Sequence, residues 1–271
     1  MKSYAIYDKD LDRASPIGYL FYYEKAKGFI IELQKDLDEW EAPLLFQKSV
    51  REKKYTISNE ISLMWVRERV IPSGRQNIGS ILKNHNLKEY SEIAMLELSK
   101  GKSSQDACYI KAIDKDQIPQ EIIERRNKNI CECFPTEDKQ IICMYKDDVV
   151  QKVDISLLSD RYNDITYVLK NKEILNSVKI GIGGYSIVFN DSIEVQTYDL
   201  RKIGKELPLS YTDLINFVRR NLINTTKACD MMQCSRQNLS YMVKTDKLQP
   251  IIIDTKENFY MKGDIEGAMS N

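Results

Sequence analysis

The chain has 271 residues, 42% of them hydrophobic and 30% charged, and its 40 basic residues balance 40 acidic ones. This composition is typical of a globular protein of two or three domains and excludes a strongly basic or acidic chain. No apolar run approaches the roughly 20 residues of a membrane span, and the N-terminus lacks the apolar core of a signal peptide. We therefore expect a cytoplasmic protein with no membrane partner.

Few residues indicate catalysis or metal binding. The six cysteines are scattered and predict reduced thiols, and Cys131 and Cys133 lack the further ligands that a zinc site needs. His85 is the single histidine. Catalytic triads and acid–base pairs that use histidine are therefore not indicated by the sequence. The glycines at 181–184 do not complete a phosphate-binding motif and predict a hairpin turn. We predict a protein that is not an enzyme and has no cofactor or metal.

Residues 1–115 predict a first α+β domain. Residues 2–8, 17–24 and 28–33 are rich in aromatic and β-branched side chains and predict strands. Residues 38–52 predict a partly helical segment with an acidic, solvated face. The apolar spacing that follows predicts a helix with Trp65 as a core anchor.

The domain continues with two predicted helices and a strand. Ser73 and Gln76 form a capping box that predicts the start of the first helix. Ser91 is expected to open the second helix, and Gly101 is expected to close it. Residues 107–113 then predict a strand.

Residues 60–113 contain a pattern of a helix followed by a second helix and a strand, carried by Arg69, Ile71, Pro72, Arg75, Gln76, Ile78, Ser103, Asp106, Tyr109 and Ile110. This pattern resembles the N-terminal regulatory segment of HipA-type toxin kinases. Nothing downstream resembles the kinase body, so the resemblance implies a docking or regulatory module without kinase activity. A generic α+β domain with a solvated helix start at Arg75 and Gln76 is the alternative.

The next segments predict a connector and a second small domain. Residues 116–138 are polar and contain one amphipathic pattern, which predicts a linker helix. Residues 139–205 predict short strands, with turns at Asp147-Asp148 and Asn190-Asp191. The layout of this region is carried by Val153, Asp154, Ile155, Leu157, Val178, Ile187, Asn190, Asp191, Tyr198 and Leu200. It is similar to the family called domain of unknown function 2442, which implies an interaction or dimerisation surface.

Residues 206–271 predict a winged helix-turn-helix. Thr225 or Thr226 is expected to cap a first helix, the turn lies at Gln233-Cys234, and Ser235 caps a second helix that places Leu239 inward. Residues 251–253 and 259–261 predict the strands of the wing, joined by a polar turn at 254–258. The predicted DNA-binding residues are Thr226, Ser235, Arg236, Gln237, Asn238, Tyr241, Lys244, Lys247 and Lys256.

This C-terminal pattern resembles the excisionase and MerR-like group of DNA-binding domains. The residues that carry it are Thr225, Cys229, Ser235, Arg236, Leu239, Lys244, Leu248, Asp264, Ile265 and Glu266. Cys229 stands where the group usually has alanine. The resemblance implies binding of double-stranded DNA by the second helix.

Local charge agrees with a DNA partner. The segment from Arg219 to Lys247 contains six basic and two acidic residues in an otherwise neutral chain. The first hypothesis is a transcriptional repressor or antitoxin-like regulator that reads an operator and dimerises or binds a protein partner through residues 1–205. The second is a toxin-neutralising or phage anti-defence interaction protein with an autoregulatory helix-turn-helix. For the C-terminal segment alone, a small helical domain with a solvated face is the alternative to DNA binding.

Overall fold

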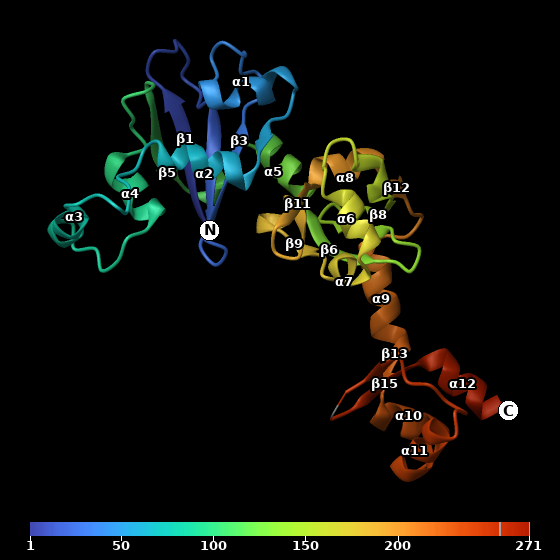
Figure 1. The fold of residues 1–271 in the computed structure, drawn as a ribbon. Coiled ribbons are helices and arrows are strands. Elements are labelled where there is room, and N and C mark those ends of the chain that lie inside the picture. Colours follow the sequence, from blue (N-terminus) through green and yellow to red (C-terminus); the bar gives the residue numbers. More distant parts are fainter. Residues whose placement is uncertain (255, 271) are drawn as a thin grey trace. The chain divides into compact units, whose positions relative to one another are not determined.

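The computed structural model describes residues 1–254 and 256–270 and confirms the predicted α+β architecture. The chain divides into two compact units (Figure 1). Unit 1 comprises Met1–Asp147 and Lys152–Lys205, and unit 2 comprises Asp148–Gln151 and Glu206–Asn271. Within the described residues, no helix is both long and apolar enough to cross a lipid bilayer.

An antiparallel sheet in the order β4-β3-β2-β1-β5 forms the first part of unit 1. Its first three strands lie within a residue of the predicted ranges. Lys27 makes the tight turn between β2 and β3 with a left-handed φ of 48°. The strands are β1 (Lys2–Asp8), β2 (Gly18–Tyr23), β3 (Gly28–Leu33), β4 (Thr56–Ile57) and β5 (Cys108–Ile113).

Helices cover one face of this sheet and bury the predicted anchor Trp65 (Figure 1). The Trp65 side chain is fully buried, and its ring stacks on Phe46 with 6.1 Å between the ring centres. The buried guanidinium of Arg69 lies on the same indole at 3.8 Å and is paired with Asp106. These helices are α1 (Leu44–Arg51), α2 (Asn59–Arg67) and α4 (Glu92–Ser99).

The predicted capping box at Ser73 and Gln76 is wrong. Helix α3 (Ile78–Asn84) begins after Asn77, whose side chain makes no capping hydrogen bond. Consecutive turns occupy the preceding residues, because the amide of Arg75 bonds to the Pro72 carbonyl and that of Ile78 bonds to the Arg75 carbonyl. Helix α4 does start at Ser91, where Oγ accepts a hydrogen bond from the Ala94 amide.

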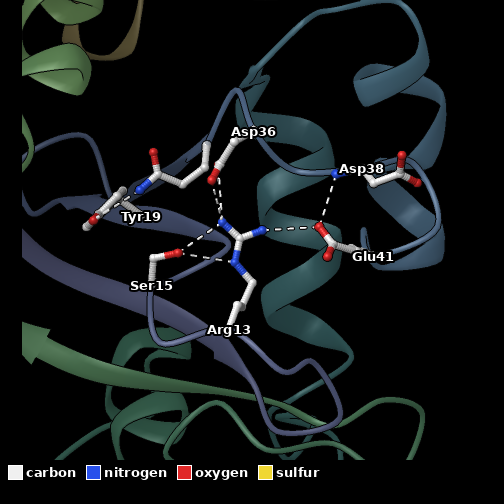
Figure 2. A network of polar contacts seen from close by, with 7 residues as sticks. Arg13, Ser15, Tyr19, Asp36, Asp38 and Glu41 are labelled. Atoms are coloured by element: carbon white, nitrogen blue, oxygen red, sulfur yellow. Dashed lines mark hydrogen bonds and ion pairs between the residues drawn. The ribbon is translucent and has the colours of Figure 1, made fainter.

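The segment over residues 38–52 is partly helical, as predicted, and a charged network holds the residues before α1 (Figure 2). Arg13 donates to both carboxylate oxygens of Asp36 at 3.1 Å and to Glu41 at 3.2 Å. Glu41 also accepts from the Asp38 amide. These bonds hold the segment in turns, and α1 begins only after Pro43. Of the acidic residues expected to form a solvated face, Asp36 and Glu41 bind Arg13, and Glu39 pairs with Arg51.

Residues 116–138 do not form the predicted linker. The segment contains the short helix η1 (Lys115–Gln117), helix α5 (Gln120–Asn127) and strand β6 (Ile130–Pro135). Ile122 of α5 is fully buried against the second face of the first sheet, beside Phe21. Burial of this apolar side of α5 makes the helix a part of unit 1.

Short strands and helices make up the next part of the chain, in which Val150, Gln151 and Glu206 belong to unit 2. The glycines at 181–184 lie between the paired strands β9 and β10, as predicted for a hairpin. Asn190 and Asp191 form the predicted turn, both with left-handed φ. The elements are β7 (Ile141–Tyr145), β8 (Val150–Val153), η2 (Ile155–Leu158), α6 (Ile165–Lys170), α7 (Lys172–Asn176), β9 (Lys179–Ile180), η3 (Ile182–Gly184), β10 (Ser186–Phe189), β11 (Ile193–Gln196), α8 (Thr197–Ile203) and β12 (Lys205–Glu206).

Sheets in the orders β12-β8-β7-β6 and β11-β10-β9 organise these strands. Contacts within unit 1 join the region of the β11-β10-β9 sheet to the first sheet. Tyr185 meets Tyr23 edge to face, with 6.4 Å between the ring centres. At Gly183, an added Cβ would lie 2.5 Å from the Tyr23 ring, so only a glycine fits there.

Burial controls the reactivity of Cys133. Its side chain is 8% exposed, and burial, reinforced by the charge of Glu132, raises its pKa to about 11. Because the thiolate is the nucleophile, we expect iodoacetamide at about pH 8 to modify Cys133 far more slowly than the partly exposed Cys234. Labelling of Cys133 should accelerate as the pH rises towards 11. Peptide mass spectrometry would measure both rates, and equal rates at pH 8 would contradict the buried position.

Candidate nucleic-acid interface

Unit 2 contains a helix-turn-helix packed on a small sheet. Helices α10, α11 and α12 gather around β13 and β15 (Figure 1). The strands pair antiparallel in the order β13-β15-β14. The elements are α9 (Tyr211–Asn221), β13 (Leu222–Asn224), α10 (Thr225–Met232), α11 (Arg236–Lys244), β14 (Ile252–Ile253), β15 (Asn258–Met261) and α12 (Lys262–Ser270).

The two central helices meet at the predicted turn. Gln233 ends α10 with a left-handed φ of 50°, and Ser235 begins α11 by accepting a hydrogen bond from the Asn238 amide at 3.2 Å. The predicted cap of α10 is wrong by one or two residues. Asn224, not Thr225 or Thr226, accepts the capping bond, because its carboxamide oxygen lies 3.0 Å from the Lys227 amide.

A small apolar core fixes the angle between these helices. Leu239 is 1% exposed and packs in one cluster with Ala228, Tyr260 and Ile265. Cys229, which departs from the alanine of the resembled group, is buried in the same cluster. The inner face of α11 is thus anchored, and the opposite face is presented to solvent.

All nine predicted DNA-binding side chains are exposed, and most of them lie on α11. Arg236, Gln237 and Asn238 occupy the first turn of α11, where a recognition helix contacts bases. Tyr241, which is 59% exposed, and Lys244 follow along the helix. Arginine, glutamine and asparagine are the side chains that pair with guanine and adenine edges in the major groove.

Thr226, one of the predicted DNA-binding residues, also makes a contact within unit 2. Its hydroxyl accepts a hydrogen bond from Nη2 of Arg236 at 2.8 Å, which links the start of α10 to the start of α11. This contact joins residues ten positions apart, and local helix patterns do not reveal it. The guanidinium is held at the exposed end of α11 while its other donors are available to a ligand.

The wing follows α11 as predicted, with β14 and β15 close to the expected ranges. Sequence reasoning missed β13, which pairs with β15 and completes the sheet. A cavity of about 400 Å³ lies between α11 and the wing. Its lining includes Arg236, Lys244 and Lys256, together with the acidic Asp254 and Glu257, so its positive charge is moderate. Thr255 of the predicted wing turn and the side chain of Glu266 lie outside the described residues.

Unit 2 thus combines two helices joined by a tight turn, an exposed polar helix face and a small antiparallel sheet, and it belongs to a chain with a larger α+β unit. Comparisons with protein-family models, with curated proteins and with solved structures found no match. The family resemblances of the sequence therefore stay predictions.

Proposed function

We propose that the protein binds double-stranded DNA through unit 2, with α11 in the major groove and the β14–β15 wing beside the phosphate backbone. The observation that supports this most is the first turn of α11. It displays Arg236, Gln237 and Asn238 to solvent, while Leu239 anchors the helix in the core. Lys244, Lys247 and Lys256 supply exposed cations for phosphate contacts.

The cellular role that fits this interface is transcriptional regulation, as a repressor or an antitoxin-like regulator. One small DNA-binding domain contacts few base pairs. High specificity therefore requires two such domains at neighbouring half-sites. We propose that residues 1–205 provide the dimer contact or bind a protein partner that controls access to the operator.

Substitution of Arg236 tests the DNA proposal. An operator would first be selected from random duplex DNA with the full-length protein. Arg236→Ala should then weaken binding to this operator by about 1–3 kcal/mol, because a base contact and its charge are lost. Fluorescence anisotropy at fixed salt would measure the affinities.

Lys83→Ala provides a charge-matched control, since Lys83 is exposed on α3 in unit 1. It should leave operator affinity unchanged. The proposed function is wrong if selection yields no enriched sequence and the wild-type protein does not retard duplex DNA at low salt. If an operator is found and Arg236→Ala binds it as tightly as the wild type, only the assignment of Arg236 fails.

A protein-interaction function is the second candidate, and one observation favours it. Ile252 and Ile253 of the edge strand β14 are 46% and 77% exposed, and Ile251 directly before it is 57% exposed. A row of exposed isoleucines on a strand edge is more typical of a protein contact than of a phosphate contact. Ile252→Lys would abolish such a contact, whereas it should leave or slightly improve DNA binding.

A further inference from the structure

Unit 1 contains a cleft that the proposed DNA binding does not use. Two cavities of about 280 and 290 Å³ share walls formed by Thr56, Arg125, Lys128 and Tyr198. Strand β4, helix α5 with the Lys128 that follows its last residue, and helix α8 supply these residues. We call the two cavities together the basic cleft. Their combined size suits a small organic ligand.

Positive charge dominates the lining of the basic cleft. The first cavity is lined by Arg125, Lys128, Arg201 and Lys202, and no acidic side chain of the described residues lines it. The second adds lysines at 35, 53 and 54 and the carboxylates of Glu121 and Glu124. Cations gathered around a cavity repel one another and create a positive potential that favours an anionic ligand.

The cations of the basic cleft differ in how they are paired. Arg201 is bonded to Asp147, and Arg125 is bonded to the buried Glu32 at 2.8 Å. By contrast, no carboxylate among the described side chains lies within 4.0 Å of the ammonium groups of Lys128 or Lys202. These two lysines therefore retain charge that an incoming anion would neutralise.

Hydrogen-bond donors and an aromatic ring stand beside this charge. Nε of Arg125 is buried and has no acceptor in the described part of the chain. The ring of Tyr198 is 36% exposed, with the Lys54 ammonium 6.0 Å from its centre. Burial, together with the charge of Asp199, raises the pKa of Tyr198 to about 12, so its hydroxyl stays protonated. The cleft thus offers cations, a hydroxyl and a flat ring.

We propose that the basic cleft binds a small phosphorylated molecule, with its phosphates between Lys128 and Lys202. Phosphate groups carry more than one negative charge and accept several hydrogen bonds. They therefore suit a cleft in which several cationic donors lie close together. A nucleotide would also place its ring against Tyr198, whereas pyrophosphate would use the cations alone.

Calorimetric titration of the full-length protein tests the proposal. The probes are inorganic pyrophosphate, ATP and adenosine, at constant ionic strength. Pyrophosphate, ATP or both should bind saturably, and adenosine alone should not. The double variant Lys128→Gln/Lys202→Gln should bind at least about tenfold more weakly, because two charged contacts are lost.

Lys83→Gln/Lys88→Gln is the matched control, since both lysines are exposed elsewhere in unit 1 and the charge loss is equal. It should bind like the wild type. ATP binding without pyrophosphate binding, weakened by Tyr198→Ala, would identify a nucleotide as the ligand type. The proposal is overturned if neither phosphate probe binds or if both double variants weaken binding equally.

Discussion

Arg125→Ala is expected to destabilise unit 1 by about 3–5 kcal/mol, because it leaves the carboxylate of Glu32 buried without its ionic partner. The Glu32 side chain is fully buried, and Arg125 Nη1 lies 2.8 Å from its Oε2. The Thr56 hydroxyl also donates to Oε2 at 3.0 Å. One hydroxyl does not replace a guanidinium, so the variant must either bury an unpaired charge or protonate Glu32.

Chemical denaturation followed by circular dichroism would measure this loss of stability. Arg67→Ala is a matched control, because the Arg67–Glu92 pair is longer, at 3.7 Å, and the Arg67 side chain is 63% exposed. Its effect should stay within about 1 kcal/mol. In the double variant Glu32→Leu/Arg125→Met, apolar side chains replace both charges, and much of the stability should return. If Arg125→Ala costs no more than Arg67→Ala, the buried pair does not stabilise unit 1.

The same pair shows why sequence reasoning mistook α5 for a linker. Residues 116–138 are polar, and their few isoleucines match a solvated connector as well as a packed helix. What distinguishes the two is the partner of Arg125, which lies 93 residues earlier in the chain. Strands β1, β2 and β3 and helix α2 were predictable because alternation, helical spacing and N-caps are local signals. Pairings between distant residues leave no local signal.

The candidate interface was more accessible to prediction than the basic cleft. A helix-turn-helix is encoded within a short segment, so the cap Ser235, the turn at Gln233 and the inward Leu239 appear in order along the sequence. The basic cleft joins residues from Thr56 to Lys202, which no local pattern brings together. The hydrogen bond from Arg236 to Thr226 lies between these cases, since the residues are near in sequence but the contact depends on helix packing.

Leu239→Ala is expected to unfold unit 2 selectively and to abolish DNA binding, although it changes none of the nine predicted contact residues. Truncation of a buried leucine costs about 2–5 kcal/mol, because apolar contacts are lost and a cavity remains. Leu239 is 1% exposed, and the cluster around it is small. A domain with so small a core has little stability to lose.

Hydrogen exchange followed by mass spectrometry separates the two units in this test. In Leu239→Ala, amides of α10, α11 and β15 should exchange rapidly, while those of β1, β2 and β3 keep the protection of the wild type. Ile253→Ala is the matched control, because it truncates an aliphatic side chain of unit 2 that is 77% exposed. It should leave both exchange and operator binding unchanged. Simultaneous loss of protection in β1–β3 would show that the units fold as one, and unchanged binding by Leu239→Ala would show that α11 does not require this core to engage DNA.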